Sequence, residues 1–140
     1  MNALLTAIVT WLSINFGLPA IYDHPSVAVV TEAQVTKLRY GTDHVSDGRV
    51  VMAVYNDATH SVSLTNSWTG RTPAELSVLV HEMVHHLQNK AGLSYRCPAA
   101  REVLAYAAQA KWLSQFGSDL EREFGIDPMT LKVRTSCMIP

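Results

Sequence analysis

The segment His81-Glu82-Met83-Val84-His85 has the residue types and the spacing of a metal site. Two histidines four residues apart on a helix lie on one face, one turn above the other, so both imidazoles can reach a single Zn²⁺. The glutamate between them projects roughly 100° around the helix axis, where its carboxylate can contact a water beside the metal. The pattern therefore predicts two metal ligands and a general base.

The flanking residues predict the helix that would position this pair. Thr72 is a typical N-cap, Pro73 suits the first helical position, and Glu75 stands three residues after the cap. Apolar residues at helical spacing should form the stripe that faces the core: Leu76, Val80, Met83 and Leu87. Both histidines lie off that stripe, so we expect them to face a cleft, and Gly92 should end the helix. The alternative is a surface helix with two incidental histidines.

A catalytic zinc needs a third protein ligand, and Glu102 is the candidate. It lies 17 residues after His85, on a second predicted helix that Pro98 opens. Tyr106 and Gln109 share its helical face. An unpaired carboxylate on a half-apolar face is costly, and a metal would satisfy it. The alternative is an ordinary glutamate near a helix start, where the macrodipole favours negative charge.

With Glu102 added, the motif resembles the gluzincin branch of the zincin metallopeptidases over roughly residues 50 to 116. The metzincin branch is excluded, because Gln88 and Ala91 stand where it needs glycine and histidine. The resemblance implies a small α+β zincin-like domain, mostly helical, with a short and mainly antiparallel sheet beside the active-site helix. One position departs from the pattern: many gluzincins carry an aspartate four residues after the ligand glutamate, where this chain has Tyr106.

The resemblance also implies zinc-dependent hydrolysis of a peptide or protein substrate. His81, His85 and Glu102 would hold Zn²⁺, and Glu82 would act as the general base. A separate donor should stabilise the oxyanion, and the candidates are Tyr106, His86, Tyr95 and His60. Of these, Tyr106 is assigned to the catalytic set, whereas His86 is expected to be a solvated surface residue. Two other hypotheses stay open: a zincin-like module that binds metal or a partner without useful turnover, and a structural protein.

Composition predicts one domain over residues 1–140 and excludes some partners. The net charge is −1 and the sequence has no basic stripe, so the charge pattern gives no indication of nucleic-acid binding. The apolar start, residues 3–14, is too short to span a membrane. Its polar residues, Thr6 and Thr10 among them, recur at helical spacing, so we expect a helix packed on the domain. The sequence does not determine the oligomeric state.

The two cysteines, Cys97 and Cys137, can form one intramolecular bond. We expect a disulfide that ties the C-terminal tail to the loop before the Glu102 helix, in an exported protein, periplasmic or secreted. The alternative is two free thiols in a reducing cytoplasm.

The remaining segments are expected to form the helices and strands that support the site. Residues 27–30 should form a short buried strand, and residues 31–40 a helix that opens with a capping box. Residues 50–55 and 61–65 should form a hairpin. By the resemblance, its edge is the candidate to align an extended peptide, although a plain sheet edge is at least as good an explanation. Trp68 should lie in the core. Helices beginning at Ser118 and Asp127 should cover the back of the core, without chemistry.

Overall fold

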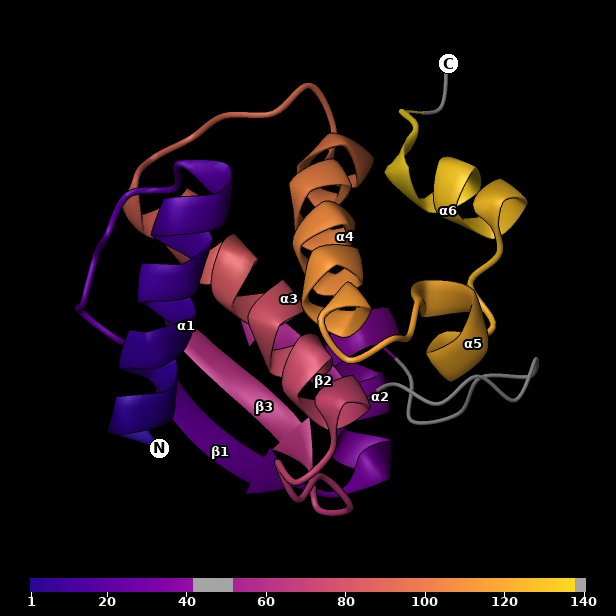
Figure 1. The fold of residues 1–140 in the computed structure, drawn as a ribbon. Helices are drawn as coiled ribbons and strands as arrows, with labels where there is room; N and C mark the ends of the chain where they lie inside the picture. The colour runs from indigo at the N-terminus through magenta and orange to yellow at the C-terminus, as the bar shows by residue number, and fades with distance from the viewer. Residues whose placement is uncertain (42–51, 138–140) are drawn as a thin grey trace.

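The computed structural model describes residues 1–41 and 52–137. Within these ranges the chain has six helices and three strands (Figure 1). In chain order they are α1 (Asn2–Phe16), β1 (Ser26–Val30), α2 (Glu32–Tyr40), β2 (Ala53–Asn56), β3 (Ser61–Thr65), α3 (Pro73–Lys90), α4 (Pro98–Ser114), α5 (Leu120–Phe124) and α6 (Pro128–Thr135). The predicted α+β class, mostly helical with a small sheet, is confirmed. Among the described helices none has both the length and the apolar character to cross a membrane.

The sheet has the strand order β1-β3-β2 and is mixed. β2 and β3 form the predicted antiparallel hairpin, with Tyr55 opposite Val62, although residues 50 and 51 of that prediction lie outside the described ranges. β1 instead pairs in parallel with β3, so the mainly antiparallel sheet that we expected is corrected to a mixed one. β3 is central and buries Val62 and Leu64, as its alternation predicted. β1 is an edge strand of the described sheet with Val29 60% exposed, so the prediction of a buried strand was wrong.

Helix α3 is the centre of the fold. It contacts α4 on one side, and α1 and β2 on others (Figure 1). The predicted core stripe is confirmed at Val80, Met83 and Leu87, each fully buried. Polar residues outside that stripe are buried as well, because neighbouring elements cover several faces of the helix: Ser77, Glu82, His85, His86 and Gln88.

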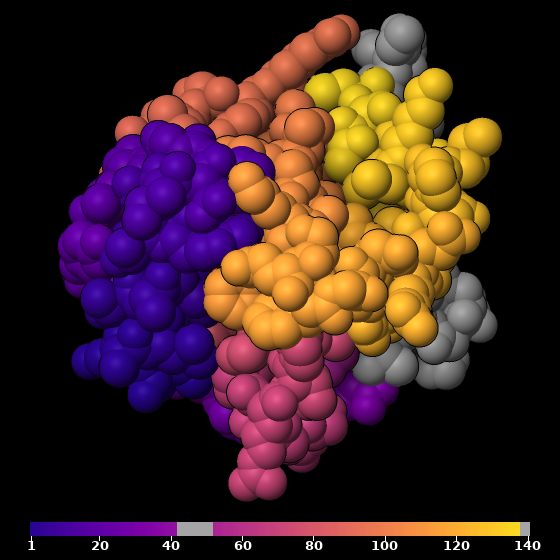
Figure 2. Space-filling model, viewed as in Figure 1, coloured from indigo at the N-terminus to yellow at the C-terminus, as the bar shows by residue number. Residues whose placement is uncertain are grey.

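Helix α1 packs on the domain, as its polar spacing predicted. Its aliphatic face is buried through Leu5, Ile8, Val9 and Leu12, whereas Thr6 and Thr10 are exposed. Burying such a side chain contributes roughly 1.5–3 kcal/mol relative to leaving it exposed. Trp11 meets Trp112 of α4 edge to face, with ring centroids 5.2 Å apart. Figure 2 shows α1 lying against the end of α4 on one face of the molecule.

The entrance to α3 is fixed by a network around Glu75. The Thr72 side chain accepts a hydrogen bond from the Glu75 amide at 3.1 Å, which confirms the predicted N-cap. The Glu75 carboxylate also accepts hydrogen bonds from the amides of Thr69 and Gly70 and from both threonine hydroxyls. Trp68 packs on the core as predicted, and its Nε1 donates to the Glu75 carbonyl at 2.8 Å. These bonds fix the chain before the helix.

The C-terminal helices are tied to the start of α4. Cys97 and Cys137 form the predicted disulfide, a bond compatible with an oxidising, exported location. The N-cap of α6 is Asp127, as predicted, and it accepts from the Thr130 amide at 2.7 Å. The start of α5 differs by one residue from the prediction, because Asp119 caps this helix instead of the preceding serine.

Candidate metal centre

Three side chains from two helices converge on one point. Nε2 of His81 lies 2.8 Å from Glu102 Oε2, and Nε2 of His85 lies 3.1 Å from Glu102 Oε1. One potential ligand atom from each residue lies within 4.8 Å of the others. The residues that the spacing predicted as ligands are therefore brought together, and the group could hold a metal ion.

The packing of α3 on α4 creates this convergence. The one-turn spacing places both histidine rings on the face of α3 toward α4, with their centroids 5.1 Å apart. Gly92, with φ of 67°, allows the chain to turn after α3. Pro98 then opens α4 at the position where its missing amide costs nothing. Glu102 consequently lies in the second turn of α4, opposite the histidines.

Gln109 orients the first of these histidines. Its Oε1 lies 2.8 Å from His81 Nδ1, and its Nε2 donates to Ser77 Oγ at 3.2 Å. The Ser77 hydroxyl donates its own proton to the Ala74 carbonyl at 2.6 Å, so it can only accept from Gln109. The amide orientation is thereby fixed, and His81 Nδ1 must be the donor to Oε1. In the tautomer with its single proton on Nδ1, Nε2 is the nitrogen of His81 that can bind a metal.

Gln88 orients the second histidine in the same way. Its Oε1 lies 2.9 Å from His85 Nδ1, while its Nε2 donates to the Arg101 carbonyl at 3.1 Å. Because a carbonyl can only accept, this bond also fixes the amide, and His85 Nδ1 is the donor. Gln88 was used in the sequence only to exclude another motif, and its role was missed. An amide side chain three residues after His85, on the same side of the predicted helix, was the available signal.

The electrostatics of the cluster favour a cation. Burial opposes charge on His85, but hydrogen bonding to Glu102 and the charges of Glu82 and Glu102 outweigh it, so the pKa of His85 is raised. Burial also opposes charge on Glu102, yet its bonds to His81 and His85 hold the pKa of this carboxyl well below its usual range. The two shifts have the same origin, because the buried carboxylate of Glu102 faces the imidazole nitrogens of the histidines. A positive charge between the carboxylate and the nitrogens would stabilise this arrangement.

Glu82 lies beside the cluster and is not tied to it. Its side chain is 7% exposed and lines the cavity next to His81 and His85. Within the described ranges, no hydrogen bond or ion pair reaches its carboxylate. Burial raises the pKa of Glu82, while the nearby histidines oppose that shift only in part. A buried carboxylate without a fixed partner, and with a raised pKa, has the properties of a general base.

The cavity in front of these residues has a volume of about 720 Å³. Tyr106 forms part of its wall, with its ring edge-on to His81 at a centroid distance of 4.6 Å. Burial raises the pKa of Tyr106, although Arg134 opposes the shift, so the hydroxyl keeps its proton. Arg134 Nη1 donates to Tyr106 Oη at 3.2 Å, and Arg134 also lines the cavity. The expectation that the C-terminal helices only cover the back of the core was therefore wrong about α6.

The other predicted oxyanion donors do not reach this cavity. His86 is 1% exposed; its Nε2 donates to the Asp23 carbonyl at 2.7 Å and its Nδ1 lies 2.9 Å from Tyr55 Oη. The prediction of a solvated His86 was wrong, because distant segments cover that side of α3. His60 packs edge-on to His86, with ring centroids 6.4 Å apart. Tyr95 borders a separate, smaller cavity.

The donor set fits Zn²⁺. Two neutral imidazole nitrogens and one carboxylate are the ligands of a His₂Glu catalytic zinc site, which keeps its fourth position open. Ligand atoms about 2.1 Å from zinc at tetrahedral angles lie roughly 3.4 Å apart. The contacts of 2.8 and 3.1 Å, each to a different oxygen of Glu102, are about 0.6 and 0.3 Å shorter than that separation, and the three candidate ligand atoms lie within 4.8 Å of one another. Hydrogen bonds from the two histidines to Gln109 and Gln88 are of the kind that supports metal-binding histidines from outside.

The chain was compared with known families, curated proteins and solved structures. Neither the curated proteins nor the solved structures include a match. Residues 1–139 match the family described as a domain of unknown function, DUF6647. The match covers nearly the whole chain, and the protein therefore belongs to the DUF6647 family.

Proposed function

We propose that this protein is a zinc metallopeptidase in which His81, His85 and Glu102 hold the metal. The observation that carries the proposal is the position of Glu82, a buried carboxylate with no partner in the described part of the chain, beside three converging candidate ligand atoms in an open cavity. A structural metal site needs no such base. Zn²⁺ held there would acidify water and polarise a carbonyl.

Glu82 and Tyr106 have separate roles in this reaction. Glu82 takes a proton from the water that attacks the carbonyl carbon, and returns it to the amine when the carbon–nitrogen bond breaks. Tyr106 directs its hydroxyl proton toward the oxyanion, because that oxygen already accepts from Arg134 and burial keeps the phenol neutral. Tyr106 thus has a candidate role despite occupying the position where many gluzincins carry an aspartate.

Strand β2 offers a place for the substrate backbone. It forms one edge of the described sheet, and Ala53, Val54 and Tyr55 line the same cavity as the cluster. A peptide added to this edge would be held by main-chain hydrogen bonds, which tolerate varied side chains.

Glu82→Gln separates catalysis from metal binding. Glutamine has nearly the same size but cannot accept the proton, and residue 82 is not one of the ligands. We expect Glu82→Gln to bind one zinc normally and to hydrolyse peptides at least about 10²-fold more slowly, the lower end for general acid–base catalysis. The assay is mass spectrometry of a mixed peptide library, with chelated wild type as the control. Undiminished zinc-dependent cleavage by Glu82→Gln would contradict the mechanism. No cleavage by zinc-loaded wild type would favour a binding module.

A further inference from the structure

Helix α6 brings a cation into the cavity of the metal centre. Arg134 is half-buried, and its Nη1 donates to Tyr106 Oη at 3.2 Å. The Tyr106 ring in turn packs on His81 at 4.6 Å. The guanidinium group of Arg134 is thus connected to the candidate ligand His81 through a single residue, Tyr106. No carboxylate in the described part of the chain forms an ion pair with Arg134.

Arg39 contributes a second positive charge to the same cavity. This residue, near the end of α2, lines the cavity, and within residues 1–41 and 52–137 it has no acidic partner. Arg39 is exposed and therefore available to a ligand that enters from solvent.

Among the described residues that line the cavity, the charges would not balance once a divalent cation is bound. Asp57 and Arg101 neutralise one another through paired bonds of 2.6 and 2.9 Å. A bound divalent ion would balance the carboxylates of Glu82 and Glu102. The guanidinium groups of Arg39 and Arg134 then have no counter-charge among the described residues of the lining, and they would attract anions to the cavity.

We propose that Arg134, assisted by Arg39, binds a carboxylate of the substrate beside the metal centre. This inference rests on the proposed peptidase function and narrows its substrate class to peptides with a carboxylate near the scissile bond. A guanidinium offers two parallel donors that match the two oxygens of a carboxylate. The carboxylate has two sources, the C-terminus of a peptide or an Asp or Glu side chain, and the same chemistry recognises both.

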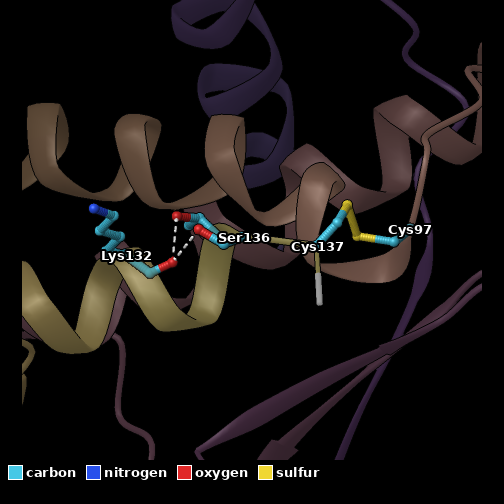
Figure 3. The surroundings of a disulfide bond; sticks show 5 residues. Cys97, Lys132, Ser136 and Cys137 are labelled. Carbon is cyan, nitrogen blue, oxygen red and sulfur yellow. Dashed lines mark hydrogen bonds between the residues drawn. A yellow bond between two sulfur atoms is a disulfide. The ribbon is translucent and has the colours of Figure 1, made fainter. Parts of the chain in front are cut away.

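The disulfide holds Arg134 in place for this role. None of the residues of α6 is fully buried, and its main apolar contact is Leu131 on a small cluster beside α4. Cys137 follows α6 closely and bonds to Cys97, the residue before α4 (Figure 3). The covalent link therefore joins the helix that carries Arg134 to the helix that carries Glu102 and Tyr106.

The test measures binding in the absence of turnover. Zinc-loaded, oxidised Glu82→Gln protein is equilibrated with three pools of N-acetylated peptides, and retained peptides are counted by mass spectrometry. The first pool has free C-terminal carboxylates and no acidic side chains. The second has the same sequences as C-terminal amides, and the third has amides with one internal glutamate. We expect the first or the third pool to bind at least about tenfold more tightly than the second, as one charge-assisted hydrogen-bonded contact provides. Whichever pool is preferred identifies the source of the carboxylate.

Variants at two positions of α6 test whether Arg134 causes the preference for peptides with a carboxylate. In the same Glu82→Gln background, Arg134→Gln should reduce the preference by about tenfold, whereas Arg134→Lys should retain part of it. Lys132→Gln is the matched control, because Lys132 is an exposed cation on α6 that does not line the cavity. Zinc stoichiometry and thermal unfolding establish that each variant is folded. Equal binding of all pools, no binding of any pool, a preference unchanged in Arg134→Gln, or one equally lost in Lys132→Gln would overturn the proposal.

The same pools separate this proposal from the proposed function. Hydrolysis of all three pools by wild type at equal rates would leave the peptidase function standing and remove the carboxylate site. If peptides with a carboxylate are retained selectively and this depends on Arg134, but wild type hydrolyses none of the pools, the carboxylate site would stand and the peptidase function would be removed.

Discussion

Replacing Gln109 with leucine removes the acceptor that fixes His81 in the tautomer that a metal needs. In the protein, Gln109 Oε1 accepts from His81 Nδ1 at 2.8 Å, and Gln109 is buried. In Gln109→Leu, the metal-binding tautomer keeps a proton on Nδ1 with no partner inside the protein. An unsatisfied buried donor costs about 1–3 kcal/mol. At about 1.4 kcal/mol for each factor of ten, we expect zinc affinity to fall roughly 5- to 150-fold.

The affinity is measured by competition with a chromophoric zinc chelator at fixed pH. Gln109→Glu should retain tight binding, because a carboxylate still accepts from Nδ1 and raises the basicity of the ligand. Gln88→Leu should weaken binding to a similar extent, because Gln88 holds His85 in the same manner. Gln115→Leu is the matched control, since Gln115 is exposed at the end of α4 and far along it from Glu102. Unchanged zinc affinity in both Gln88→Leu and Gln109→Leu would refute the reasoning about tautomers.

Two further predictions concern stability. The hydrogen bond from the Thr69 amide leads the contacts that hold the pKa of Glu75 below its ordinary value of 4.5. This carboxylate therefore stabilises the fold above that pH and loses its contribution as the pH falls through the folded pKa. Glu75→Gln should cost about 1 kcal/mol at neutral pH in urea unfolding, and the difference from wild type should shrink in acid; a constant difference would contradict this. Opening the Cys97–Cys137 bond, across a sequence separation of 40, should cost up to about 4 kcal/mol in the chain-entropy model, measured on the double serine variant. A variant as stable as oxidised wild type would show that the bond does not constrain the unfolded chain.

Local sequence signals were sufficient to bring the candidate ligands together. The cap at Thr72, the proline after it and the one-turn spacing of His81 and His85 are properties of one helix, and the structure has them as predicted. Glu102 was found from its distance along the chain and its helical face, because α4 follows α3 after a short loop. Such features depend on neighbours in sequence, so they can be read without knowing the tertiary packing.

Features that depend on distant packing were missed. His86 looked solvated because helical periodicity describes one buried face, whereas Tyr55 and Asp23 cover a second face of α3. Arg134 gave no signal, because its place in the cavity follows from the packing of α6 on α4 and from the disulfide. The burial of β1 was overestimated, since an apolar run does not tell a central strand from an edge strand.

Metal analysis of the purified protein tests the proposed zinc centre most directly. Wild type loaded with Zn²⁺ and dialysed should retain one zinc per chain, because three converging ligand atoms and two supporting glutamines form one site. The His81→Ala, His85→Ala double variant should retain none, and Glu102→Ala should bind more weakly than wild type. Stoichiometric zinc in the double variant, or wild type that binds no zinc, would contradict the assignment of this site.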